Sequence, residues 1–148
     1  MKVRIADVRL LSKAEYLQNI DLVGKRQPWW WLGDTCPDKN GYALAVYLTD
    51  VIGLYEVEQT FGVVPVLVLQ DKTLPAGSKL SYGGEIFTVL RDGLAICDKR
   101  IAHCAFRKDW QAEDANQFQK SEIKQWLERW FNTNGGIAKT IELDGTSI

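Results

Sequence analysis

Three consecutive tryptophans, in the run PWWWL at residues 28–32, constrain the fold of this 148-residue chain more than any other stretch. Successive side chains of a β-strand point to opposite faces, so Trp29 and Trp31 would point one way and Trp30 the other. Such a strand needs apolar cover on both sides. The run FGVVPVLVL at residues 61–69 is apolar almost throughout, which is typical of a strand buried on both faces. We expect the two strands to be neighbours in the core of one sheet.

An amphipathic helix over residues 121–131 is the first candidate for that cover. Ser121 can cap its N-terminus. One broad face of the helix is apolar and is formed by Ile123, Trp126, Leu127, Trp130 and Phe131. We expect this helix to pack on one face of the tryptophan strand and the strands of residues 85–97 to pack on the other.

The other elements follow from capping and from alternation of apolar and polar residues. Ser12 and Glu15 form a capping-box pattern that starts a helix over residues 13–19. Strands are expected at residues 3–11, 42–48, 54–58, 79–82, 85–91 and 94–98, with a closing strand at 137–143 that pairs near the first.

Turn residues join some of these strands and interrupt others. The pairs Gly83-Gly84 and Asp92-Gly93 tolerate positive φ, so they predict two tight hairpins and hence a β-meander. Pro65 lacks an amide hydrogen and therefore marks an edge, a bulge or a strand end.

Composition and charge narrow the classes of partner. With 46% hydrophobic and 25% charged residues, the chain has the composition of a soluble globular protein. Its net charge is −1 and no run of Lys or Arg exceeds two residues, whereas binding to phosphate backbones requires a basic surface. No apolar run approaches the ~20 residues of a membrane span, and the N-terminus lacks the apolar core of a signal peptide. We expect no nucleic acid, no membrane contact and a cytoplasmic location.

Two blocks of this sequence resemble the halves of an uncharacterised bacterial and phage domain family. Residues 8–15 (VRLLSKAE), 28–32 (PWWWL) and 61–67 (FGVVPVL) are similar to the LLS..E, WWLRSPG and GVRPAL motifs of its C-terminal half. Residues 84–90 (GEIFTVL) and 121–127 (SEIKQWL) are similar to the G....f.W.VL and S.lr.WLN motifs of its N-terminal half.

The halves stand in reversed order, so the resemblance implies a circular permutation. Residues 1–70 match the family's C-terminal half and residues 79–131 match its N-terminal half, within a single domain over 1–148. Permutation is tolerated where the original termini lie close together at the surface. A permuted or swapped arrangement also leaves an intertwined homodimer open.

The family is similar in pattern to C-type-lectin-like folds, which include formylglycine-generating enzymes and the variable proteins diversified by retroelements. The resemblance implies an α+β fold in which two helices flank twisted antiparallel sheets. Most members of this group bind proteins or sugars, and only some catalyse. Two family arginines are replaced here by Gly33 and Val64, so we transfer no functional residue from them.

The catalytic and metal-binding candidates are weak. Cys97 and Cys104 could imitate the cysteine pair of formylglycine-generating enzymes, but buried thiols are the simpler interpretation. The only histidine, His103, is adjacent to Cys104, and adjacent strand residues point to opposite faces. A polar loop and the turn after it could supply some oxygens of a calcium site, from Asp34, Asp38, Asn40 and Asp50. We expect no catalytic residue, no metal and no cofactor.

Aromatic residues that border polar segments are the better candidates for function, since such side chains act as rigid anchors for proteins or sugars. The candidate binding rim comprises Trp31, Asp34, Asp38, Asn40, Tyr42, Tyr47 and Tyr55. The sequence therefore predicts a non-enzymatic recognition domain, with a protein ligand favoured over a glycan. One alternative is a small phage or mobile-element protein that inhibits a host enzyme in the host cytoplasm. A second alternative is a metal-dependent enzyme of the formylglycine-generating type.

Overall fold

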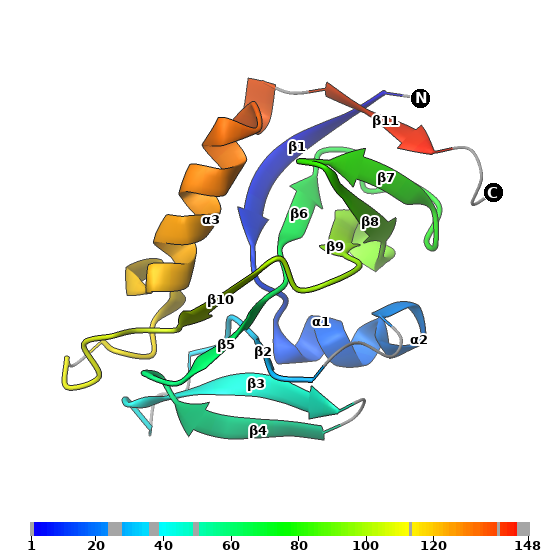
Figure 1. The fold of residues 1–148 in the computed structure, drawn as a ribbon. Helices are drawn as coiled ribbons and strands as arrows, with labels where there is room; N and C mark the ends of the chain where they lie inside the picture. The colour runs from blue at the N-terminus through cyan, green and yellow to red at the C-terminus, as the bar shows by residue number, and fades with distance from the viewer. Residues whose placement is uncertain are drawn as a thin grey trace.

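The strands of the computed structural model form a closed barrel and a second, open sheet (Figure 1). The structure describes residues 2–23, 28–35, 39–48, 51–112, 114–138 and 140–144. Around the barrel the order is β1 (Lys2–Arg9), β11 (Thr140–Asp144), β7 (Lys79–Tyr82), β8 (Glu85–Val89), β9 (Leu94–Cys97) and β6 (Val66–Leu69), which pairs again with β1. In the open sheet the order is β10 (Ala102–Ala105), β5 (Thr60–Val63), β2 (Trp30–Trp31), β3 (Tyr42–Leu48) and β4 (Val51–Glu56).

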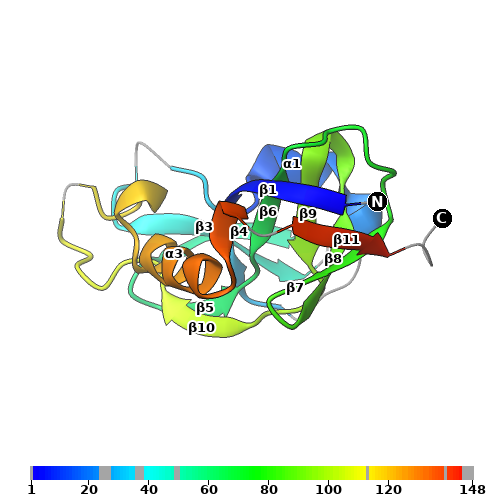
Figure 2. The same cartoon turned by 90° about the horizontal axis from the view of Figure 1, so that it is seen from above.

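Few helices accompany these curled, mostly antiparallel sheets, so the fold is mixed α+β. The helical segments are α1 (Lys13–Gln18), α2 (Ile20–Val23) and α3 (Glu122–Thr133), with the short 3-10 segments η1 (Arg91–Gly93), η2 (Phe118–Lys120) and η3 (Gly136–Ala138). Seen from above, the barrel lies to one side and α3 with the open sheet to the other (Figure 2). Within the described ranges, no helix has both the length and the apolar character needed to cross a membrane.

The predicted meander is confirmed by β7, β8 and β9, which pair in that order in antiparallel register. Gly83 and Gly84 join β7 to β8 with φ values of 60° and 79°. Asp92 and Gly93 join β8 to β9 with φ values of 64° and 75°. Two successive positive φ values match the right-handed twist of a hairpin, which explains why these dipeptides stand at the turns.

The closing strand is also confirmed, because β11 pairs with β1 through Val3 and Ile141 (Figure 2). The predicted caps are present as well. The Ser121 hydroxyl accepts the Lys124 amide at 3.0 Å at the start of α3. The pairing of β1 with β11 places the first and last described strands side by side in the barrel.

The apolar run of residues 61–69 is two strands and not one. β5 belongs to the open sheet and β6 to the barrel, with Val64 and Pro65 buried between them. Pro65 has no amide to continue the ladder, so the run ends as a strand there, as predicted. Trp30 pairs with Gly62 in parallel register, which confirms that the tryptophan strand and the start of this run are neighbours.

The rings that cover the tryptophan strand differ from the expected ones. Trp30 packs edge-on against Tyr16 of α1, with ring centroids 5.7 Å apart. Trp31 packs against Phe61 at 4.6 Å and Phe106 at 5.5 Å. α3 instead packs along β1 and β10, and the meander forms part of the barrel wall. The aromatic cover therefore comes from α1 on one face and from β5 and the segment after β10 on the other.

Candidate functional site

Four aromatic side chains gather on one side of the open sheet, and we call them the aromatic face: Trp29, Tyr47, Tyr55 and Phe61. The Trp29 ring lies at their centre, with its centroid 4.6 Å from Tyr47, 5.1 Å from Tyr55 and 5.0 Å from Phe61. Three of the four side chains are half-buried, and Tyr47 is exposed. The cluster is thus packed internally while it still presents ring surface to solvent.

The backbone of Trp29 is held in an unusual conformation. Its φ is 67°, in the left-handed region that bulky residues rarely adopt. Hydrogen bonds fix it on both sides, since its N–H donates to the Val46 carbonyl at 2.9 Å and its carbonyl accepts the Gly62 amide at 2.7 Å. Such a conformation costs about 1–3 kcal/mol and is typical of binding and catalytic sites. The fold therefore retains a destabilising backbone conformation that holds the Trp29 indole in this position.

Gly53, two residues before Tyr55 on β4, leaves room for the Tyr55 ring. A Cβ atom added to Gly53 would lie only 2.9–3.0 Å from three side-chain atoms of Tyr55, two ring carbons and the hydroxyl oxygen. Because no side chain stands there, the Tyr55 ring can lie over Gly53 and edge-on to both Trp29 and Phe61. Gly53 is therefore part of the site although it carries no chemistry.

The Trp31 ring packs against Phe61 and extends the row of rings into the core. Trp31 was predicted as part of the binding rim, and its burial corrects that prediction. Its side chain is 0% exposed, and its indole N–H donates to the Cys104 carbonyl at 2.9 Å. A fully buried indole with a satisfied donor stabilises the sheet and cannot contact a ligand. Trp29, and not Trp31, is the indole of this row that reaches the surface. It was absent from the predicted rim although alternation places it on the same face as Trp31.

Asp34 and Asn40, the two polar members of the predicted rim that the structure describes, make hydrogen bonds within the fold. An Asp34 carboxylate oxygen accepts the Lys13 amide at 2.7 Å, which ties the end of the tryptophan segment to the start of α1. The Asn40 amide donates to the Ala112 carbonyl and so fastens the loop before β3. Asp38 lies outside the described residues. The structure therefore unites only Tyr47 and Tyr55 of the predicted rim.

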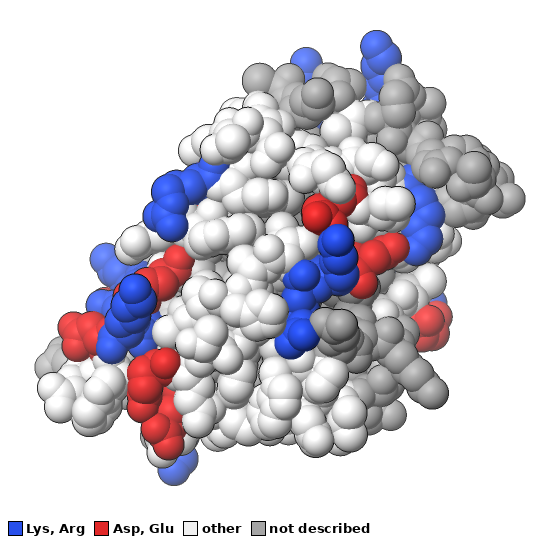
Figure 3. Space-filling view, in the orientation of Figure 1, with Lys and Arg blue, Asp and Glu red and all other residues white. Residues whose placement is uncertain are grey.

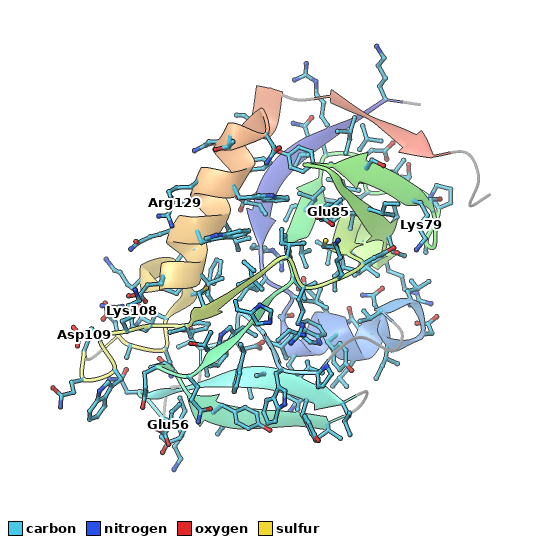
Figure 4. All side chains as sticks on the ribbon, in the orientation of Figure 1. Glu56, Lys79, Glu85, Lys108, Asp109 and Arg129 are labelled. Carbon is cyan, nitrogen blue, oxygen red and sulfur yellow. The ribbon has the colours of Figure 1, made fainter. Side chains whose placement is uncertain are left out.

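Tyr42, the last predicted rim residue, lies at the opposite end of β3. With Gly41, Trp110, Glu56 and Glu58 it lines a cavity of about 520 Å³, which we call the acidic hollow. Glu56 lies at the end of the β3–β4 hairpin, near the loop that carries Lys108 and Asp109 (Figure 4). A hydrogen bond to the Glu58 carboxyl and the repulsion between the two charges raise the pKa of Glu56 above its usual value.

Exposed apolar side chains concentrate on the β3–β4 hairpin. Of nine large hydrophobic side chains that are exposed in the described part of the chain, five lie on these two strands: Tyr42, Tyr47, Leu48, Val51 and Leu54. Figure 3 shows uncharged side chains over most of the surface formed by this hairpin and β5. Alternation places Tyr42 and Leu54 on the sheet face opposite Tyr55, so apolar side chains are exposed on both faces of this hairpin. Exposed apolar surface is a mark of interaction sites.

Of the cysteines that the structure describes, Cys97 and Cys104 lie in different sheets, and His103 is next to Cys104. Cys97 is buried in the barrel strand β9, whereas Cys104 is on β10 of the open sheet. Burial raises the pKa of the Cys104 thiol to about 11, so the nucleophilic thiolate is scarce at neutral pH. His103 is exposed beside it. Over the residues that the structure describes, no three His, Cys, Asp or Glu side chains are grouped so that they could hold a metal ion.

Comparisons of this chain with protein-family models, with curated proteins and with solved structures find no match. Function is therefore inferred from the surface of the open sheet. That surface combines a strained indole, a cluster of half-exposed rings and an apolar hairpin at the edge of a sheet.

Proposed function

We propose that this chain is a non-enzymatic recognition domain that binds a protein through the aromatic face and the β3–β4 hairpin. The concentration of exposed apolar side chains on this hairpin carries the proposal. Aromatic residues are enriched at protein interfaces, and a few buried aromatic anchors supply most of the binding energy. The fixed backbone of Trp29 supports the same interpretation, because rigid anchors lose little entropy when a partner binds.

A protein ligand is favoured over a glycan because of what lies next to the rings. Leu48, at the end of β3, and Val51, at the start of β4, are 49% and 45% exposed. Aliphatic side chains gain from covering by other apolar groups, whereas a small-ligand or sugar site needs several polar groups that converge on the ligand. An inhibitor of a host enzyme would use the same surface, with the enzyme as its protein partner.

We also propose that the fold is C-type-lectin-like and that the chain is a circular permutation of the family with the WWLRSPG and GVRPAL motifs. Two features support this proposal. β6, which ends the first matching half, pairs with β9 of the second half, and β1 lies beside β11 and η3, next to the end of α3. A variant whose N- and C-termini are linked and whose chain is opened within residues 71–76 has the family's order of the two halves. It should fold if the two orders are equivalent. Loss of its cooperative unfolding would contradict the permutation.

The binding surface can be tested with a matched pair of variants. A partner is isolated from a cell extract on the immobilised chain, purified separately and titrated by calorimetry. Tyr47→Ser, on the aromatic face, should weaken binding about tenfold or more, the loss expected of an interface anchor. Ile86→Ser is the control, because Ile86 is also a large exposed hydrophobic residue, at 53%, but lies on the barrel strand β8.

Three results would count against the proposal. Equal affinity of both variants for the partner would remove the aromatic face from the interface. An effect of Ile86→Ser alone would move the interface to the barrel. Saturable binding of soluble oligosaccharides that Tyr47→Ser abolishes would replace the protein ligand with a glycan.

A further inference from the structure

β4 is the last strand of the open sheet, and its outer edge is open. In the described residues it pairs with β3 and with no other strand. Proteins commonly protect such an edge with Lys or Pro residues. β4 has the sequence VIGLYE, which includes neither, and its one charge is at the final residue, Glu56. No other described strand pairs with this edge, so it can accept an added strand.

The ladder fixes which backbone groups point outward. The Val57 amide donates to the Gly41 carbonyl at 3.0 Å, so this pair is a hydrogen-bonded one. Hydrogen-bonded and non-bonded pairs alternate along an antiparallel ladder. The next pair, Tyr42 with Glu56, is therefore non-bonded, as are the two pairs that contain Leu54 and Ile52. The N–H and C=O groups of Ile52, Leu54 and Glu56 consequently point away from β3. The Glu56 carbonyl already accepts the Gln59 amide at 3.1 Å, so the open groups are both groups of Ile52 and Leu54 and the Glu56 amide.

The far side of β3 agrees with this assignment. Since the outward groups of β4 belong to alternate residues, the groups of β3 that face β2 should belong to Leu44 and Val46. Their carbonyls do accept amides from that side, from Leu32 and Trp29 respectively, each at 2.9 Å. The direction of the open groups on β4 therefore follows from observed bonds on both sides of β3.

The acidic hollow lies at one end of this edge. Glu56 is directly opposite Tyr42, so both side chains lie on the same face of the sheet, and Glu58 and Trp110 line the same cavity. Two neighbouring carboxylates attract a cation, and exposed aromatic rings stabilise one further. Arg107, in the loop beside this end, is already paired with Asp114 at 3.3 Å.

We propose that β4 accepts an extended segment of the partner protein as an added antiparallel strand, with a Lys or Arg opposite Glu56 and apolar residues opposite Leu54 and Ile52. This inference rests on the proposed function and specifies its ligand. Because the added strand runs against β4, the segment reads basic, any, apolar, any, apolar from its N-terminus. A second copy of this chain fits less well, since β4 has no Lys or Arg to place against Glu56.

Synthetic peptides test this pairing before the partner is identified. The probe is an acetylated and amidated peptide that contains Lys-Thr-Val-Thr-Val. The amides of its two Val residues would donate to Leu54 and Ile52, its Lys carbonyl would accept the Glu56 amide, and its Thr amides would point away. N-methylation of the first Val should therefore abolish binding, whereas N-methylation of the first Thr should not. Replacement of the Lys by Glu should weaken binding about tenfold or more, and Glu56→Gln with Glu58→Gln should remove most of that difference.

Amide hydrogen exchange on the full chain locates the peptide. The amides of Ile52, Leu54 and Glu56 should exchange more slowly in its presence, while those of Gly53 and Tyr55 are already bonded to β3 and should change little. Leu54→Lys, which places a protective charge on the edge, should prevent binding. Ile86→Lys, on the exposed surface of β8, is the matched control and should not.

Several results would overturn strand addition at β4. They are equal loss of binding with either N-methyl group, protection at residues away from β4, and slow exchange of the three edge amides in a dimer formed without peptide. The proposed function can fail separately. If Tyr47→Ser weakens the isolated partner but the edge amides of its complex are unchanged, only the pairing is wrong. If the peptide binds β4 but Tyr47→Ser leaves partner affinity unchanged, only the aromatic face is wrong.

Discussion

Replacement of Trp29 by alanine and by glycine measures both the packing and the strain of the aromatic face. The alanine variant loses three ring pairs, each worth about 0.5–1.5 kcal/mol, so its free energy of unfolding should fall by about 1.5–4.5 kcal/mol. It keeps the left-handed φ of 67°, which costs an alanine about 1–2 kcal/mol and a glycine almost nothing. The glycine variant should therefore be more stable than the alanine variant by about 1 kcal/mol.

Urea denaturation followed by circular dichroism checks that order, provided that the slope of unfolding free energy against urea stays constant between variants. The control is the same pair of substitutions at Tyr47, which lies in β3 without a positive φ. There glycine should be less stable than alanine by about 0.5–1 kcal/mol. If glycine is the less stable choice at both positions, the backbone of Trp29 is not left-handed and the reasoning about a strained, fixed indole fails.

Three further predictions concern single polar groups. The Ser78 hydroxyl is buried and has no hydrogen-bond partner in the described residues, so Ser78→Ala should raise the thermal midpoint, with a gain of about 1 kcal/mol; a lower midpoint would mean that this hydroxyl is bonded. Glu58 raises the pKa of Glu56, so the folded state binds protons more tightly than the unfolded state and loses stability as pH rises. Glu58→Gln should therefore stabilise the protein at pH 7 and not at about pH 3, where the Glu56 carboxyl is protonated and the repulsion is absent; a pH-independent effect would contradict the repulsion. The Arg9 guanidinium and the Ser12 amide hold the pKa of Glu15 below its usual value, so its contribution is present at neutral pH and lost as pH falls through that lowered pKa. Glu15→Gln should cost about 1 kcal/mol in thermal unfolding at pH 7 and little at about pH 2, since the ion pair is partly exposed; an equal cost at both pH values would show that the charge is irrelevant.

Local sequence signals predicted the elements, and long-range packing decided what lies against them. Gly83 and Gly84 adopt positive φ because the hairpin twist requires it, and this requirement can be recognised in the sequence alone. The contact between Trp30 and Tyr16 joins α1 to the open sheet, and no local pattern specifies which ring will cover an indole. The sequence also shows that Pro65 interrupts a strand, but it does not show that the strands on either side enter different sheets.

The site was predictable to the same extent. Tyr47 and Tyr55 were predicted as members of a binding rim, and in the structure both rings pack against Trp29. Alternation assigns Trp29 and Trp31 to one face but does not reveal which of them is covered, and Phe106, far along the chain, buries Trp31. The conformation of Trp29 depends on bonds to Val46 and Gly62 of two other strands, so no nearby residue signals it.

The most direct test of the open sheet as the binding surface is hydrogen exchange of the whole chain, alone and with its isolated protein partner. We expect slower exchange in the complex at β4 and around the aromatic face, with unchanged exchange in the barrel strands β7 and β8. Protection confined to the barrel or to α3, with the amides of β4 unaffected, would contradict a recognition role for this surface.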